Sequence, residues 1–141
     1  MLARRELSEA QVRERLERHG HDASAIDAAV ARLQQERAID DRRVAEVIAR
    51  HEAAAGRRGR LGVQWRIERA GIAGATARRA AEEAYRGVDA EVLIEASITK
   101  RLRGRATIAD DREFQRLYRY LVRLGFDSDH AIRALKARSI K

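Results

Sequence analysis

The amino-acid sequence predicts an all-α protein built as an elongated tandem array of three-helix repeats. Its 141 residues include no Pro, they are rich in the helix-favouring residues Ala, Arg, Glu and Leu, and no segment needs a strand to explain its pattern. Ala supplies much of the 45% apolar content and buries little area per residue. A thin core repeated along the chain therefore fits better than one thick core.

Capping residues and glycines predict where the helices begin and end. Ser8 opens the first helix in a capping box with Gln11, and Asp22 opens the second. Acidic pairs at 40–41 and 110–111 open two later helices, because carboxylates favour the positive end of the helix dipole. The eight helices are expected at 8–20, from 22 to beyond 33, at 40–56, and at about 62–70, 75–86, 89–103, 110–124 and 128–138. The glycines expected to end helices are Gly20, Gly56 with Gly59, Gly71, Gly87 and Gly125.

Apolar spacing predicts the inward face of each helix. The inward residues of the first three helices are Val12 and Leu16, then Ile26, Val30 and Leu33, then Val44, Val47, Ile48 and Ala55. One pattern recurs, in which an apolar residue stands four positions before a helix-ending glycine. It occurs as Leu16 with Gly20, Ile67 with Gly71, and Leu121 with Gly125, at separations of 51 and 54 residues. The positions six and ten residues past these glycines are Ile26, Ala77 and Ala131, and Val30, Ala81 and Leu135. The helix that follows each glycine is therefore predicted to keep the same inward face.

These recurrences divide the chain into three helical repeats of about fifty residues. The expected boundaries are 1–38, 39–87 and 88–141, and the first repeat is shortened because only residues 2–7 precede Ser8. Each repeat offers a narrow apolar stripe, so we expect it to need its neighbours for burial and the array to be elongated. A three-helix or six-helix globule with coincidental glycine spacing is the alternative.

Positive charge is concentrated in the second and third repeats. The chain has 30 basic and 22 acidic residues, a net charge of +8, and almost all of the basic residues are Arg. Residues 1–38 hold seven of each sign, residues 39–87 hold eleven basic against seven acidic, and residues 88–141 hold twelve against eight. Contact with a polyanion is therefore predicted for the later two thirds of the chain.

The composition argues against several kinds of chemistry. The absence of Cys excludes disulfides and thiolate metal sites, and no apolar run is long enough to cross a membrane, so a cytoplasmic protein is expected. The four His lack spaced partner ligands, and the acidic pairs are better explained as helix caps than as metal ligands. The glycines between 56 and 62 follow no strand and lack the Walker lysine and hydroxyl. We therefore expect a binding protein rather than an enzyme, with no catalytic residue, cofactor or metal.

Two clusters of basic residues are the candidate binding sites. The first consists of Arg57, Arg58, Arg60, Arg66 and Arg69, and the second of Lys100, Arg101, Arg103, Arg105, Arg112, Arg116, Arg119 and Arg123. The last four are spaced by four, three and four residues, which places them on one helix face. A solvated face is the better explanation of any single Arg. For the four in register beside a basic loop, binding of a polyanion or of an acidic protein groove explains the pattern as well as a solvated face does.

Aromatic residues could add base stacking to these clusters. Trp65, Tyr118 and Tyr120 lie within them, and single-strand binders stack bases on such side chains. Burial between helices explains Trp65 at least as well, and three aromatics without a strand platform do not make a stacking surface.

Four segments together resemble the RecX family of bacterial regulators of the RecA recombinase. They are LARRELSEAQVRERLERHG at 2–20, IDDRRVAE at 39–46, GRLGVQWRIERAG at 59–71 and YLVRLGFDSDHAIRAL at 120–135. The most specific positions are Leu2, Arg4, Arg5, Glu6 and Ser8 with Gly20, then Asp40, Asp41 and Ala45, then Leu121, Arg123, Gly125 and Phe126. The sequence departs from the family where Arg60 follows Gly59, a position that is commonly Pro, and where Val44 replaces a common aromatic.

The resemblance implies a monomeric regulator in recombination and DNA repair that lies in the helical groove of a RecA filament on single-stranded DNA. Bound there, it would impede filament growth, ATP hydrolysis and strand exchange. Two alternatives stay open from the residues alone. One is a sequence-tolerant DNA-binding module that acts without a recombinase, and the other is a scaffold that binds an acidic protein surface.

Overall fold

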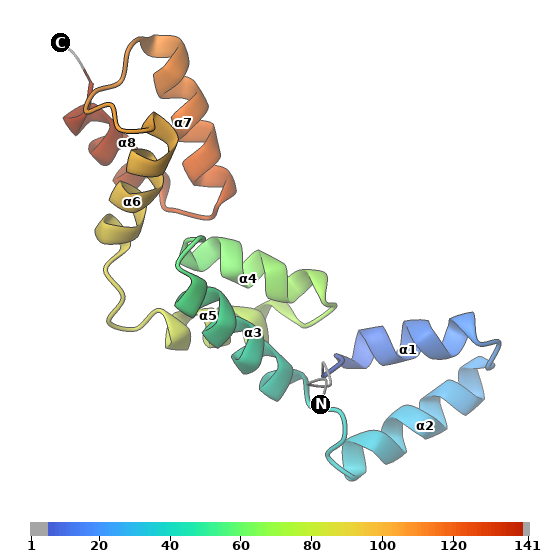
Figure 1. The fold of residues 1–141 in the computed structure, drawn as a ribbon. Coiled ribbons are helices and arrows are strands. Elements are labelled where there is room, and N and C mark those ends of the chain that lie inside the picture. The colour runs from blue at the N-terminus through green and yellow to red at the C-terminus, as the bar shows by residue number, and fades with distance from the viewer. Residues whose placement is uncertain (1–5, 140–141) are drawn as a thin grey trace.

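The computed structural model describes residues 6–139, and this part of the chain contains eight helices (Figure 1). They are α1 (Glu9–Arg18), α2 (Ala23–Gln35), α3 (Asp41–Ala55), α4 (Arg60–Arg69), α5 (Gly74–Ala84), α6 (Ala90–Leu102), α7 (Asp111–Arg123) and α8 (Ser128–Ala137). The all-α prediction is confirmed, and every predicted helix is present. Within residues 6–139 the β-type pairing is limited to one isolated bridge between Ile108 and Ser139. The expected front of the first repeat, with Leu2, Arg4 and Arg5, lies outside the described residues.

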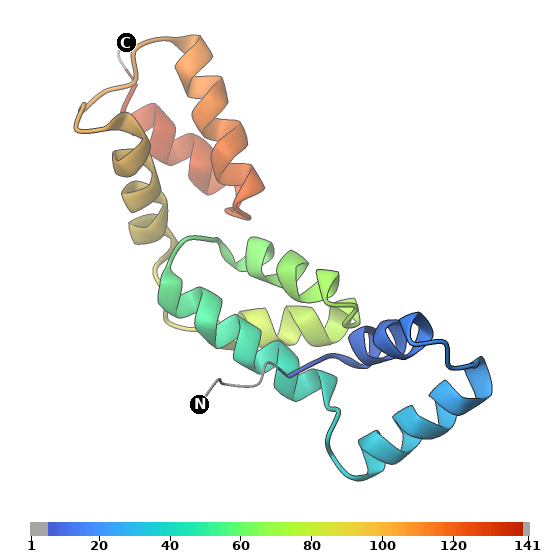
Figure 2. The ribbon, with the colours of Figure 1, turned by 45° about the vertical axis from the view of Figure 1, so that its right-hand side comes forward.

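The helices form three groups that follow one another along an elongated molecule. Figures 1 and 2 show a hairpin of α1 and α2, then α3–α5, then α6–α8 at the far end. Within the groups, α1 packs on α2, α3–α5 pack on one another, and α6–α8 pack on one another. The predicted elongated array of helical repeats is thus the observed fold.

The predicted helix starts are confirmed by hydrogen bonds. Ser8 and Gln11 form the complete capping box of α1, in which the Gln11 amide donates to Ser8 Oγ and the Ser8 amide donates to Gln11 Oε1. Asp40 accepts hydrogen bonds from two backbone amides of α3, and Asp110 accepts one from the amide of Glu113. The acidic pairs therefore begin helices, as their positions predict.

The predicted inward positions of the later repeats are confirmed. Ile67 and Leu121, four residues before their glycines, are fully buried, whereas Leu16 in α1 is only half-buried. All six positions past the glycines are buried, namely Ile26, Val30, Ala77, Ala81, Ala131 and Leu135. Ala55, in contrast, is exposed in the last turn of α3, and the buried face of that helix is formed by Val44, Ala45 and Ala49.

The cores of α3–α5 and α6–α8 are separate, which corrects for these two groups the expectation that each repeat needs its neighbours for burial. The core of α3–α5 consists of Val44, Ala45, Ala49, Val63, Ile67, Ile72, Ala77, Ala80 and Ala81. The core of α6–α8 consists of Ile94, Ile98, Leu102, Ile108, Leu117, Leu121, Phe126, Ala131 and Leu135. The two cores have no residue in common. In each of these groups the three helices pack their apolar faces against one another, so the group buries its core with its own helices.

The groups meet instead at small joints that involve glycine. At the first joint the Ser8 hydroxyl donates to the Ala70 carbonyl oxygen, and a Cβ at Gly71 would lie 2.3 Å from the Cβ of Ala10. The Glu9 amide also donates to Asp41 Oδ1 across this joint, at 2.8 Å. The start of α1 therefore lies directly against the turn that follows α4.

The second joint repeats this arrangement between α4 and α7. The Gly59 amide donates to the Leu124 carbonyl oxygen at 2.9 Å. A Cβ at Gly62 would lie 2.0 Å from that oxygen, and a Cβ at Gly125 would lie 1.8 Å from the Gly62 nitrogen. In both joints the N-cap residue of one helix donates to the carbonyl that precedes a helix-ending glycine of the next group. Glycine is needed at 62 and 125 because the two backbones touch there.

Replacing Gly62 by Ala is expected to destabilise the protein by about 1–3 kcal/mol, because the added methyl overlaps the Leu124 carbonyl and outweighs the roughly 1 kcal/mol that Ala gains over Gly in a helix. Urea unfolding measures the change, and small-angle X-ray scattering reports any opening of the second joint.

Gly74→Ala is the matched control, because the nearest atom to its added Cβ is the flexible carboxylate oxygen of Glu68 at 3.1 Å. This variant should be as stable as the parent protein or slightly more stable. Equal stabilities for Gly62→Ala and the parent would contradict the close approach at the joint.

Candidate nucleic-acid interface

The arginines of α7 form a row on the exposed face of that helix. Leu117 and Leu121 bury the opposite face in the core of α6–α8. The four exposed arginines are Arg112, Arg116, Arg119 and Arg123, and we call them the α7 row. At 1.5 Å per residue the row extends over about 16 Å. Such a row can contact several phosphates of one strand.

The loop between α6 and α7 is held by one carboxylate. Both Arg105 guanidinium Nη atoms bond to the Glu113 carboxylate, with Nη1 to Oε1 at 3.0 Å, and the Ala109 amide donates to Oε1 at 2.9 Å. The Arg105 hydrogen bonds, followed by the Ala109 amide, lower the pKa of Glu113 to about 2. Arg105 therefore links the loop to the start of α7, and both of its Nη atoms are bound to a carboxylate within the fold.

Acidification is expected to release this loop. Glu113 has a folded-state pKa of about 2, below the roughly 4.3 of an unperturbed Glu, so its contribution to stability is present above the unfolded value and is lost as the pH falls toward 2. Carboxyl NMR titration should follow the midpoint directly. Glu113→Gln should remove this part of the pH dependence, and a Glu113 midpoint near 4.3 would contradict the bidentate contact.

One more predicted site residue, Arg101, and the two tyrosines considered for base stacking form contacts within the fold. Arg101 of α6 lies over the Tyr120 ring, with its guanidinium carbon 3.9 Å from the ring centroid. This cation–π contact joins α6 to α7. Tyr118 and Tyr120 are half-buried and pack on the core of α6–α8, so packing accounts for both tyrosines.

The first basic cluster is also partly engaged. Arg58 and Arg66 approach the same carboxylate, Glu52 of α3, at 3.4 and 3.6 Å. The Tyr85 hydroxyl donates to the Arg58 carbonyl oxygen at 2.7 Å, and burial, with the nearby Glu52 carboxylate, raises the pKa of Tyr85. These contacts fix the loop between α3 and α4.

The remaining arginines of the first cluster are available to solvent. Arg57, Arg60 and Arg69 are exposed, and none of them forms an ion pair with another residue in the described part of the chain. Trp65 stands among them and is 42% exposed. Burial between helices, the alternative for Trp65 in the sequence, is therefore wrong.

The second joint brings the ends of the two clusters together. Gly59 bonds to Leu124, so Arg58 and Arg60, which flank Gly59, lie beside Arg123, which precedes Leu124. The basic residues thus follow one order along the array: the α6–α7 loop, the α7 row, the joint, and then the loop and helix of α4 (Figure 1). Sequence spacing alone does not connect these two clusters.

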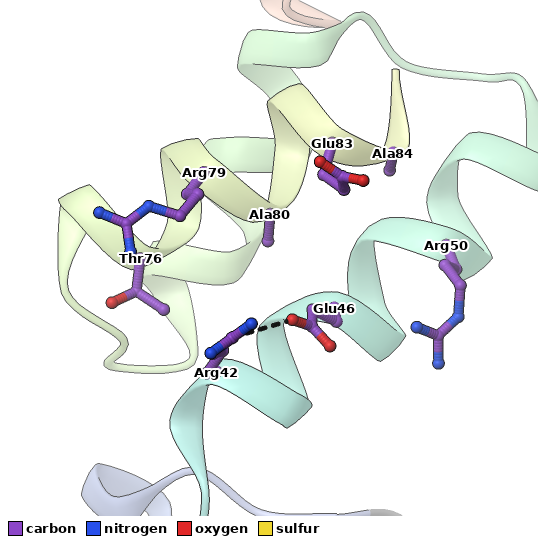
Figure 3. A pocket seen from close by; sticks show the side chains of 8 residues that line it. All are labelled: Arg42, Glu46, Arg50, Thr76, Arg79, Ala80, Glu83 and Ala84. Atoms are coloured by element: carbon purple, nitrogen blue, oxygen red, sulfur yellow. Dashed lines mark hydrogen bonds and ion pairs between the residues drawn. The ribbon is translucent and has the colours of Figure 1, made fainter. Parts of the chain in front are cut away.

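A groove between α3 and α5 contains charged residues that sequence reasoning did not select. On α3, Arg42 pairs with Glu46 at 3.2 Å. Figure 3 shows this pair with Arg79 and Glu83 on the facing α5. The other lining residues are Arg50, Thr76, Ala80 and Ala84. Both signs of charge line this groove, so it lacks the one-sided potential of the α7 row.

Between residues 6 and 139, no helix is long and apolar enough to cross a membrane.

Fold and charge together define a class of protein: an α-helical repeat array that presents exposed arginines along successive groups. A model of the first three-helix domain of RecX matches residues 1–33. The regulatory protein RecX of Syntrophotalea carbinolica is 34% identical over 134 residues, which cover 91% of this chain and 84% of that protein. The regulatory protein RecX of Halorhodospira halophila is 30% identical over 138 residues, covering 97% and 82%. The chain therefore belongs to the RecX family.

A solved structure agrees with this assignment at the level of the fold. The crystal structure of RecX from Lactobacillus salivarius superposes with a TM-score of 0.67 at 15% identity, covering 93% of this chain and 84% of that one. The two relatives confirm the sequence resemblance to RecX, and the solved structure shows that the two chains share one fold.

Proposed function

We propose that this protein regulates the RecA recombinase by lying in the groove of RecA filaments on single-stranded DNA. Bound there, it inhibits filament growth, ATP hydrolysis and strand exchange. The observation that carries the proposal is the similarity to two regulatory RecX proteins over 91% and 97% of the chain. The protein acts as a monomeric binding protein of the cytoplasm, and its effect comes from occupying a surface.

The shape and charge of the array support this proposal. An elongated chain of helical groups can follow a helical groove across several protomers. The proposed contact residues are the two predicted basic clusters, Arg57, Arg58, Arg60, Arg66 and Arg69, and Lys100, Arg101, Arg103, Arg105, Arg112, Arg116, Arg119 and Arg123. Within them, the α7 row with Arg57, Arg60 and Arg69 would meet DNA phosphates. Four other arginines of the clusters would stabilise this surface through their contacts within the fold, namely Arg58, Arg66, Arg101 and Arg105.

The test is to add the protein to preformed RecA filaments on single-stranded DNA and to follow ATP hydrolysis. We expect inhibition at amounts stoichiometric with the filament, and faster loss of filament when growth is blocked. Unchanged hydrolysis and unchanged filament length would overturn the proposal.

A second function, DNA binding without a recombinase, is favoured by the exposure of the whole α7 row. If about six phosphates of a single strand were neutralised, log affinity would fall with log salt at a slope near −4. Fluorescence anisotropy of a labelled oligonucleotide measures this slope. Binding that is undetectable at low salt would exclude this second function and leave the filament proposal standing.

A further inference from the structure

Trp65 stands on the outer side of α4, away from the core. Val63 and Ile67, two residues before and two residues after it, are both fully buried. Two residues correspond to about 200° of helical rotation, so Trp65 faces the opposite side. It is 42% exposed and is the one Trp of the chain. A large aromatic side chain on the surface, without a core to join, is a candidate contact for a ligand.

The surroundings of Trp65 are basic. Arg69 lies four residues further along α4, which places it next to Trp65 on the same face. Arg66, the next residue of the helix, is also exposed. Arg60 lies seven residues before the buried Ile67 and so on the other side of α4, where it lines a pocket with Asp127 and Asp129. The carboxylate of α4 belongs to Glu68, which is half-buried. The arrangement is an exposed indole ring with the exposed guanidinium groups of Arg66 and Arg69 on its side of α4.

We infer that Trp65 stacks on an unpaired base of single-stranded nucleic acid, while Arg69 contacts a phosphate that flanks that base. The inference rests on the proposed function and deepens it, because it names the base as a ligand of the second helical group. Aromatic stacking accepts every base and adds to phosphate contacts, as it does in proteins that bind single strands without sequence preference. A purely apolar protein partner fits less well, since the exposed guanidinium groups of Arg66 and Arg69 would then need carboxylates from that partner.

The second joint places this residue on the basic path described above. Gly59, the N-cap of α4, bonds to Leu124 at the end of the α7 row. A strand that follows the α7 row would reach the start of α4, and Trp65 stands on the second turn of that helix. The arginines of the α7 row would contact phosphates, and the Trp65 ring would stack on a base.

Tryptophan fluorescence, excited selectively over tyrosine, tests the inference directly, because Trp65 is the one Trp of the chain. Titration with an oligothymidine should quench it strongly, whereas an abasic oligomer of the same length should bind more weakly and leave the emission nearly unchanged. Trp65→Leu keeps an apolar side chain and removes the ring. By anisotropy it should weaken oligothymidine binding by about tenfold, within the range of roughly 5-fold to 150-fold that stacking on one base supports. Trp65→Phe should fall between the two.

Val92→Ala is the matched control, because Val92 is 62% exposed on α6 and its loss should leave DNA affinity unchanged. Circular dichroism should show equal helicity for all variants.

Equal affinities of the parent protein and Trp65→Leu, with no quenching, would overturn the inference. Trp65→Leu that keeps DNA affinity but loses inhibition of RecA ATP hydrolysis would also overturn it, by making Trp65 a protein contact. Quenching and weakened binding in a protein that leaves RecA filaments unaffected would support the inference and reject the proposed function.

Discussion

Replacing Arg116, Arg119 and Arg123 together by Glu is expected to lower affinity for single-stranded DNA by about 100-fold near 0.1 M salt. Each phosphate contact with a single strand contributes about 0.7 to the slope of log affinity against log salt, so losing three makes the slope shallower by about 2. All three side chains are exposed on the face of α7 opposite the buried Leu117 and Leu121. The core of α6–α8 should therefore stay intact. Anisotropy titrations at several salt concentrations measure both effects.

The matched control changes the same charge in the first helical group. Arg15 and Arg18 of α1 and Arg32 of α2 are also exposed, and they lie outside both basic clusters. Reversing these three to Glu should reduce affinity only modestly, through net charge, and should leave the slope unchanged. If both triple variants lose the same affinity, the α7 row is a solvated face and binding follows net charge alone.

Leu121→Ala is expected to destabilise the α6–α8 group by about 2–5 kcal/mol, because Leu121 is fully buried and its truncation leaves a cavity in that core. Urea unfolding followed by circular dichroism measures the loss. Val92→Ala, at a site 62% exposed in the same group, should change stability by less than about 0.5 kcal/mol. Equal stability of Leu121→Ala and the parent protein would show that the inward face of α7 is misassigned.

Two probes can separate the groups in this experiment. Trp65 lies on α4, so its fluorescence follows α3–α5, whereas circular dichroism follows all helices. Because the cores of α3–α5 and α6–α8 have no residue in common, Leu121→Ala should shift the circular dichroism transition more than the Trp65 transition. Identical shifts would mean that the second joint couples the two groups into one cooperative unit.

The candidate site was only partly predictable from residue types. Spacing predicted that the α7 row shares one face, because helical periodicity is a local property. Spacing did not predict that Arg105 is held by Glu113, or that Arg58 and Arg66 share Glu52. Those partners meet only when the chain folds. The sequence therefore does not distinguish the arginines that bind carboxylates within the fold from those that remain available to a ligand.

Burial was the other property that local pattern left open. Trp65 had two explanations, stacking and burial, and its exposure depends on where α3 and α5 pack against α4. The apolar positions of the later repeats were recognised correctly, yet the expectation that each repeat needs its neighbours for burial was wrong for α3–α5 and α6–α8. A stripe shows which face of a helix is buried, and it does not identify the helix that covers it.

The sequence by itself determined the all-α fold, the helix ends at Ser8, Asp40 and Asp110, and the inward positions that recur after each glycine. These properties depend on caps and spacings within a few residues, where the interacting groups are close along the chain. Only the tertiary structure decided that the cores are separate, that Gly62 and Gly125 touch, and that the two basic clusters meet at that joint. Each of those outcomes depends on contacts between residues far apart in the chain, for which local spacing carries no signal.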